Sequence, residues 1–273
     1  MEPPFGPIML ELGPISIYWY GFLIATGILL GARVASFLTE EGGENPEMIW
    51  DMLLVVVLLA IVGARVYHVF SSPEGGMLGW DYYKEHPAQA FAIWNGGLGI
   101  YGAIIGGAIG VTIFAYVKKL TLFQWFDFIA PGMALGQSIG RWGNFMNREL
   151  YGPPTTLPWG LRIPPMYRIP PFNDLTTYPD ATRFHPTFLY ESLATLALCL
   201  LLVWISLRFR DRLRTGDVFF AYLIGYAVIR FFIEMLRPDA WMMGTLAAAQ
   251  VFAIALAAVA AAALLIPRLT PTQ

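Results

Sequence analysis

The sequence predicts an all-α integral membrane protein with seven transmembrane helices. Of its 273 residues, 57% are hydrophobic and only 13% are charged, whereas about a quarter of the residues in a soluble domain are charged. The mean hydropathy is +0.57. Several apolar runs also approach the roughly 20 residues that a helix needs to cross a bilayer. Together these observations indicate a single polytopic membrane domain spanning residues 1–273.

The expected elements follow from the alternation of apolar runs and polar connections. Residues 1–14 are rich in proline and are expected at the membrane interface, and a short acidic turn follows the first span. Residues 140–186 form the longest non-apolar region, rich in proline and aromatic residues, and are expected to be an extracytoplasmic head segment. The predicted spans are about 15–38, 49–69, 93–117, 120–139, 188–207, 218–236 and 242–266.

Seven spans place the two termini on opposite sides of the membrane, and the distribution of lysine and arginine selects the orientation. With the N-terminus outside, the basic residues of 118–119 and 208–214 are cytoplasmic. Most basic residues on the other side lie within 140–186, which is set aside as a folded segment. We therefore expect an outside N-terminus and a cytoplasmic C-terminus.

Composition also limits the possible partners. The net charge is −2 and no basic run is interleaved with aromatic residues, so nucleic acid is not expected as a partner. Histidine and cysteine do not cluster at metal-ligand spacing. The sequence therefore predicts no metal site.

Six of the seven predicted spans place polar residues at a similar depth, in the half of the membrane that faces outside. Charged side chains inside a bilayer are costly and usually face a bundle interior or a water-filled cavity. A surplus of arginine in such a cavity favours an anion, and the phosphate of a phospholipid is the abundant candidate. The residues at this level include Tyr20, Arg65, Tyr101, Arg141, Asn144, Glu191, Tyr226, Arg230 and Glu234.

Two of these patterns also have purely structural interpretations. Arg230 and Glu234 are four residues apart and can neutralise each other within one helix. In the third span, Gly102, Gly106 and Gly110 repeat every four residues, a spacing typical of close helix packing.

The stretch 140–152, GRWGNFMNRELYG, is the most unusual in the chain. Arginines interleaved with carboxamides and glycines provide fixed charge, forked donors and a backbone that a ligand can approach closely, which suits an anionic head group. A polar helix end whose arginines reach lipid phosphates is the alternative interpretation.

This stretch resembles the G-R-x-G-N-F-x-N-x-E-x-x-G signature of bacterial prolipoprotein diacylglyceryl transferases. Further similarity lies in Trp19-Tyr20-Gly21, Gly63-Ala64-Arg65, His185-Pro186-Thr187 with Leu189-Tyr190-Glu191, and Tyr226-x3-Arg230-x3-Glu234. The resemblance therefore extends over about residues 15–240. It implies a multi-pass enzyme of the bacterial cytoplasmic membrane with its active site toward the outer leaflet.

The resemblance also implies the reaction. Such enzymes transfer the diacylglyceryl group of phosphatidylglycerol to the lipobox cysteine of a prolipoprotein, with glycerol phosphate leaving and without a cofactor. Arg141 and Arg230 are expected to stabilise the leaving phosphate, and Glu234 to hold Arg230. The expected catalytic residues are Arg141, Arg230, Glu234 and Tyr101, and the expected lipid-binding residues are Arg141, Asn144, Asn147, Glu149, Tyr20, Arg65, Tyr226 and Glu191.

One position departs from the family pattern. Many members have a histidine early in the third span, to which a base role is assigned, and Tyr101 stands there in this chain. A neutral phenol is a poor base near pH 7. Tyr101 is expected to position lipid, which leaves the base unassigned, with Glu234 and His185 as alternatives.

A lipid or anion transporter with an arginine-lined site in the outer leaflet is the main competing function. Transporters often carry internal repeats and a site at the middle of the membrane. The sequence shows no repeat, and its polar residues lie to one side of the membrane, which favours the transferase.

Overall fold

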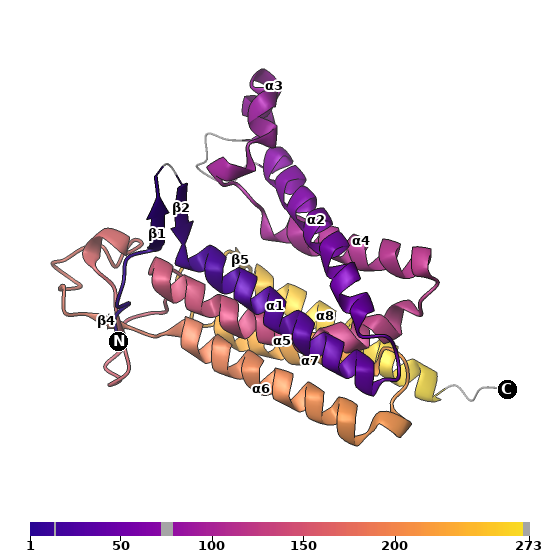
Figure 1. Ribbon diagram of the computed structural model, residues 1–273. Helices are drawn as coiled ribbons and strands as arrows, with labels where there is room; N and C mark the ends of the chain where they lie inside the picture. Colours follow the sequence, from indigo (N-terminus) through magenta and orange to yellow (C-terminus); the bar gives the residue numbers. More distant parts are fainter. Residues whose placement is uncertain (14, 72–78, 270–273) are drawn as a thin grey trace. The chain divides into compact units, whose positions relative to one another are not determined.

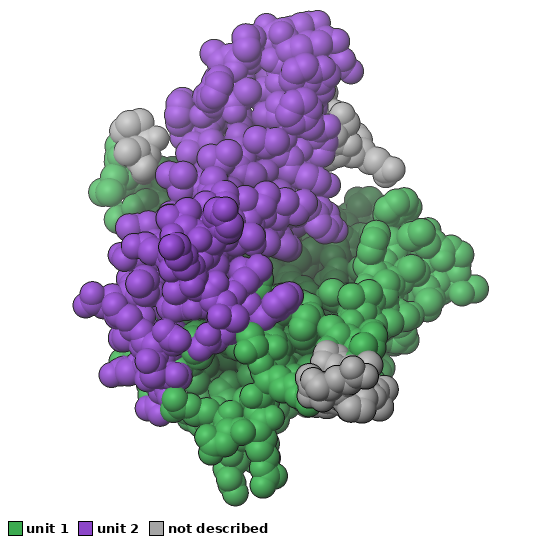
Figure 2. Space-filling model, turned by 90° about the vertical axis from the view of Figure 1, so that its right-hand side faces the viewer, with its two compact units in different colours: residues 1–38, 126–273 green, residues 39–125 purple. Residues whose placement is uncertain are grey.

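The computed structural model describes residues 1–13, 15–71 and 79–269, and helices dominate it (Figure 1). The chain forms two compact units. Unit 1 contains Met1–Leu38 and Phe126–Gln273, and unit 2 contains Thr39–Trp125 (Figure 2).

Within the described residues, five helices are long and apolar enough to cross a membrane, which supports a multi-pass membrane protein. They are α1 (Trp19–Glu41), α2 (Glu47–Phe70), α4 (Ile100–Lys118), α6 (Thr187–Arg208) and the Ala248–Ile266 part of α8 (Ala248–Leu269).

Predicted spans four and six are also helical, as α5 (Leu122–Asn147) and α7 (Asp217–Glu234). Besides residues of the expected site, α5 contains Asp127 and α7 contains Asp217. Arg230 and Glu234 lie in α7, and the polar part of the signature forms the end of α5.

Several helix bounds differ from the prediction because short strands and turns precede the helices. The strands β1 (Ile8–Leu12) and β2 (Ile15–Tyr18) form an antiparallel hairpin, so α1 begins at Trp19. The strands β5 (Met242–Met243) and β6 (Leu246–Ala247) do the same before α8.

The mostly helical structure is consistent with the predicted all-α membrane protein, and the described residues add three two-stranded sheets that the sequence did not predict. The third pairs β3 (Leu161–Arg162) with β4 (Arg183–Phe184). The signature is also more helical than expected, because α5 continues past residue 139 to Asn147.

Unit 1 contains a helical bundle held by close backbone contacts and apolar packing. A Cβ atom added to Gly31 of α1 would lie 2.6 Å from the carbonyl oxygen of Gly132 in α5. The hydroxyls of Ser138 in α5 and Ser192 in α6 are 3.1 Å apart. The apolar contacts continue from α6 to α7, and α8 packs against α7. This packing fixes the ends of α5, α6 and α7 relative to one another.

The segment from 148 to 186 is folded against the ends of α5 and α6. Its hydrophobic cluster includes Phe145 of α5 and Phe188 of α6, whose rings stack with centroids 4.6 Å apart. The buried Arg168 donates hydrogen bonds to the main-chain oxygens of Ile163, Tyr178 and Asp180, each at 2.8 Å. The segment also contains the short helical turn η3 (Pro165–Tyr167). It therefore has a defined structure beside the signature.

In unit 2, α2 packs against α4. The short helix α3 (Trp80–Glu85) and the turns η1 (Pro87–Phe91) and η2 (Ile93–Asn95) lie between them along the chain. A Cβ on Gly102 would lie 2.1 Å from the main-chain oxygen of Gly63, and one on Gly106 would lie 2.1 Å from that of Leu59. The predicted role of the G-x-x-x-G pattern in helix packing is confirmed.

Replacing Gly102 by alanine is expected to destabilise unit 2 by about 3 kcal/mol, because two backbones must separate to admit the methyl group. Gly107→Ala is the matched control on the same helix, since its Cβ would meet only a Val56 methyl group at 3.8 Å. The control should be neutral or stabilising by up to about 1 kcal/mol. Thermal unfolding in detergent compares the two variants, and equal losses would contradict this packing.

Candidate functional site

The end of α5 brings the signature residues beside α6 and α7. Phe145 and Met146 are buried in the hydrophobic cluster described above, which fixes the last turns of α5. Asn144 is 6% exposed, and Glu191, in the second turn of α6, is 3% exposed. Buried polar groups of this kind need partners, and each finds them among the neighbouring signature residues.

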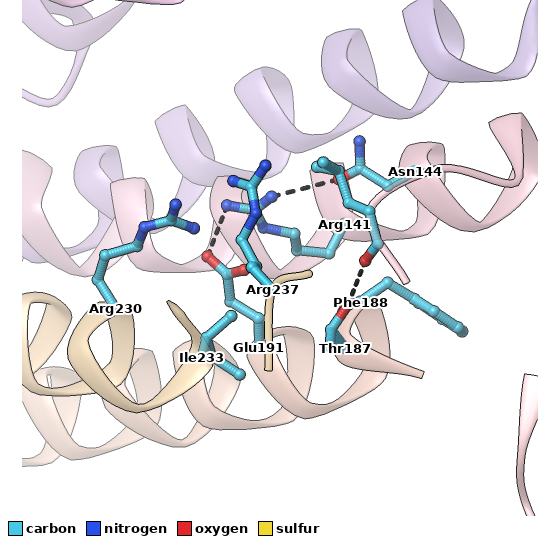
Figure 3. Close-up of a pocket in the computed structure, with 9 residues that line it drawn as sticks. Arg141, Asn144, Thr187, Phe188, Glu191, Arg230, Ile233 and Arg237 are labelled. Carbon is cyan, nitrogen blue, oxygen red and sulfur yellow. Dashed lines mark hydrogen bonds and ion pairs between the residues drawn. The ribbon is translucent and has the colours of Figure 1, made fainter. Parts of the chain in front are cut away.

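A pocket lies between these three helices (Figure 3). Arg141 of α5 and Arg230 of α7 reach toward Glu191 of α6. The free volume of the pocket is about 10 Å³, which is close to the space for one water molecule. The pocket is lined by Arg141, Asn144, Leu150, Thr187, Phe188, Glu191, Arg230, Ile233 and Arg237.

Arg141 begins a chain of polar contacts through the signature. Its Nη2 donates to Glu191 Oε1 at 2.5 Å, and its Nη1 donates to Asn144 Oδ1 at 3.3 Å. The Asn144 amide donates to Glu149 Oε1 at 2.9 Å, and the Asn147 amide donates to the same oxygen at 3.2 Å. The guanidinium and both carboxamides are therefore held in fixed positions.

Arg230 forms an ion pair with Glu234 on the next turn of α7. The side chains are 19% and 5% exposed, so the pair is largely shielded from water. Tyr226, one turn earlier, interacts with Arg141 through its hydroxyl. The prediction that Glu234 holds Arg230 agrees with this geometry.

Arg237 also lines the pocket, and the sequence interpretation missed it because it lies just beyond the predicted sixth span. Its Nη2 donates to Asp239 Oδ2 at 2.8 Å and its Nε to Oδ1 at 3.2 Å. The hydrogen bond from Arg237 holds the pKa of the Asp239 carboxyl below its ordinary value. Local spacing gave no signal for it, because α7 ends at Glu234 and the place of Arg237 depends on how the chain leaves that helix.

The lining of the pocket carries three guanidinium groups and one carboxylate. Glu234 and Asp239 hold two of the arginines from outside the lining. Each arginine is oriented by its own carboxylate, and positive charge predominates on the pocket wall. Guanidinium forks arranged in this way suit a phosphate group.

Tyr20 lies on the first turn of α1, where its ring packs on the signature. A Cβ on Gly143 would lie 2.5 Å from Tyr20 Cδ2, so this glycine admits the ring. Tyr20 does not line the arginine pocket; neither does His185, whose Nδ1 lies 3.2 Å from the Tyr190 hydroxyl. Asn147 and Glu149 line a neighbouring cavity instead.

Arg65 and Tyr101 belong to unit 2. The Arg65 guanidinium donates to four main-chain oxygens, those of Gln89, Ala90, Gly96 and Gly97, at 2.5–3.0 Å. It therefore holds the connection that leads into α4.

Tyr101 lies on the first turn of α4 and is 64% exposed. Its ring packs on that of Tyr67, with centroids 5.7 Å apart.

Comparison with known proteins identifies the family. The model of the family described as prolipoprotein diacylglyceryl transferase matches residues 7–266. A phosphatidylglycerol–prolipoprotein diacylglyceryl transferase of Trichormus variabilis is 44% identical over 252 residues, which cover 91% of this chain and 85% of that protein.

Proteins of the same name from other bacteria are similar to this chain to the same extent. The one from Chloroflexus aggregans is 43% identical over 250 residues, covering 88% of this chain and 80% of that protein. The one from Bacillus mycoides is 42% identical over 254 residues, covering 92% and 88%. Similarity of this extent, together with the signature on α5, shows that the chain belongs to the prolipoprotein diacylglyceryl transferase family.

Proposed function

We propose that the protein transfers the sn-1,2-diacylglyceryl group of phosphatidylglycerol to the lipobox cysteine of a prolipoprotein and releases glycerol phosphate. The observation that carries this proposal is the pocket in which α5, α6 and α7 place arginines and their orienting carboxylates together. Family membership supplies the two substrates, because the names of the relatives state phosphatidylglycerol and prolipoprotein.

The reaction is a substitution at the glycerol carbon that carries the phosphate. The cysteine sulfur forms a bond to that carbon, the carbon–oxygen bond breaks, and its electron pair leaves with glycerol phosphate. Arg141 and Arg230 stabilise the charge that develops on the leaving phosphate. The thiol proton leaves to a base, and a positive field lowers the pKa of a thiol bound near it, which favours the thiolate.

The remaining residues position the lipid and the arginines. Glu191 and Asn144 orient Arg141 through the contacts described above. Glu149 accepts hydrogen bonds from the carboxamides of Asn144 and Asn147, so it links these two residues beside the lipid head group. Tyr20 and Tyr226 add contacts to lipid, and Arg65 supports the start of α4, where Tyr101 positions lipid. The reaction needs no cofactor or metal.

The proposed topology extends the membrane assignment to seven spans. Helices α5 and α7 cross the membrane with their polar residues inside the protein, where such residues are tolerated. The N-terminus lies outside and the C-terminus in the cytoplasm of a bacterium, with the site toward the outer leaflet of the cytoplasmic membrane. The distribution of basic residues supports this orientation.

A mass-spectrometric assay tests the function. The purified protein is mixed with phosphatidylglycerol in detergent and a lipobox peptide with one cysteine. We expect the mass of one diacylglyceryl group to be added to the cysteine, in the presence of EDTA and without nucleic acid. Folded protein that yields no product but moves phospholipid between leaflets of a vesicle would favour the transporter.

Replacing Tyr101 by phenylalanine is expected to lower the transfer rate by less than about tenfold, because the ring positions lipid and its phenol does not act as the base near pH 7. Tyr101→Ala removes the ring and should cost more. Initial rates of peptide modification distinguish the two variants. A loss of more than about 100-fold in the phenylalanine variant would assign the phenol to proton transfer instead.

A further inference from the structure

A second cavity, of about 270 Å³, lies next to the arginine pocket. The two share Leu150, which follows the signature glutamate Glu149. Polar and apolar side chains both contribute to its wall. The cavity is lined by Asn147, Arg148, Glu149, Leu150, Tyr151, Tyr167, Ile169 and Asp239.

Arg148 is the unusual residue of this cavity. Its Nε and Nη1 are shielded from solvent, and neither has a hydrogen-bond acceptor among the described residues. The third nitrogen, Nη2, donates to the main-chain oxygen of Phe5 at 3.2 Å. The guanidinium carbon lies 4.9 Å from the centre of the Tyr167 ring. Donors buried without acceptors cost free energy and are rare in native proteins, so these two nitrogens indicate an absent partner.

The backbone around Arg148 is strained in the same place. Arg148 and Leu150 have φ angles of 59° and 54°, in the left-handed region that residues other than glycine seldom adopt. The two residues flank Glu149 and both line the cavity. Strain of this kind persists where the surrounding structure enforces it, and it clusters at binding sites.

The charges and contacts of the cavity indicate a neutral partner with carbonyl groups. Two carboxylates, those of Glu149 and Asp239, also belong to the lining, and they disfavour an anion. Because the Arg148 guanidinium already binds the main-chain oxygen of Phe5, a main-chain carbonyl suits its remaining donors. Tyr151 and Ile169 add apolar surface for side chains. The Tyr151 hydroxyl accepts the Ile169 main-chain N–H at 2.7 Å, and burial raises the pKa of Tyr151, so its phenol stays neutral.

We propose that this cavity binds the acceptor polypeptide beside its reacting cysteine, and that Arg148 donates hydrogen bonds to its main-chain carbonyls. This inference rests on the proposed function, because that function makes the acceptor a polypeptide. The Tyr167 ring covers the guanidinium and turns aside when the peptide enters. Leu150, common to both cavities, places the peptide next to the arginines that hold the phosphate.

Binding of a peptide that cannot react tests the proposal separately from catalysis. The probe is a fluorescent lipobox peptide with alanine in place of cysteine, and its Kd is measured by anisotropy with the full-length protein in detergent. Arg148→Gln is expected to raise this Kd about tenfold through the lost charge-assisted hydrogen bonds. Tyr167→Leu should lower it about two- to fivefold, because the ring no longer competes for the guanidinium.

Arg183→Gln is the matched control, since this exposed arginine also donates to a main-chain oxygen, that of Pro158, and lies outside both cavities. Its Kd should equal that of the unmodified protein. Thermal unfolding shows which variants are folded. If Arg148→Gln does not fold, the Kd of Tyr167→Leu tests the proposal.

The outcomes separate the two proposals. An unchanged Kd in folded Arg148→Gln, or weaker or equal binding in Tyr167→Leu, would overturn the peptide site even where transfer occurs. Weaker peptide binding by Arg148→Gln without transfer in the unmodified protein would support the peptide site and overturn the proposed function.

Discussion

Replacing Arg141 by lysine is expected to lower the rate of diacylglyceryl transfer by about 100- to 1,000-fold, the cost of removing one preorganised donor from a developing negative charge. Lysine retains the charge but lacks the planar fork that binds Glu191 and Asn144 together. The phosphate would then meet a cation that is no longer fixed in position. Initial rates at saturating phosphatidylglycerol measure this loss.

Arg162→Lys provides the control for the same exchange. Arg162 is 48% exposed and pairs with Asp180 at 2.5 Å, and such surface pairs contribute about 0–1 kcal/mol. Its transfer rate should match that of the unmodified protein. Similar losses in the two variants would show that the fork of Arg141 has no special role.

Replacing Arg230 by alanine is expected to lower the free energy of unfolding by about 3 kcal/mol, because Glu234 is left as a buried carboxylate without its ion-pair partner. The value lies at the lower end for broken buried pairs because Arg237 interacts with the same carboxylate. Unfolding of the purified protein in mixed detergent measures the change. The variant should also lose transfer activity, since the phosphate loses one guanidinium.

The double variant Arg230→Met with Glu234→Leu separates the two effects. It removes both charges, and exchanging a buried pair for apolar side chains is often neutral or stabilising. Its stability should therefore recover while its activity stays low. A double variant as unstable as Arg230→Ala would contradict the assignment of the stability loss to the unpaired Glu234.

Much of the helical architecture could be predicted from the sequence because membrane helices need long apolar runs. Helices α2 and α6 lie within two residues of their predicted bounds. The predicted start of a span was wrong where two short strands pair in place of the first helical residues, as in the β1–β2 hairpin before α1 and the β5–β6 hairpin before α8. Strands this short give too few residues for an alternating pattern to stand out, so a hydropathy pattern merges them with the adjoining span.

The candidate site could be predicted where spacing carried the information. The i, i+4, i+8 spacing placed Tyr226, Arg230 and Glu234 on one face of α7, and the structure confirms the ion pair. The Arg141–Glu191 contact joins residues 50 apart, so no local pattern could reveal it. Arg237 was missed for the same reason, because its position beside the pocket depends on how the chain leaves α7.

In the proposed reaction, the arginine pocket stabilises glycerol phosphate as it leaves phosphatidylglycerol. The most direct measurement uses phosphatidylglycerol labelled in its head group and follows both products, the modified peptide and the labelled glycerol phosphate. We expect equal amounts of the two products, and a parallel loss of both in Arg141→Lys. A peptide carrying only a fatty acyl group, or a modified peptide without released glycerol phosphate, would contradict it.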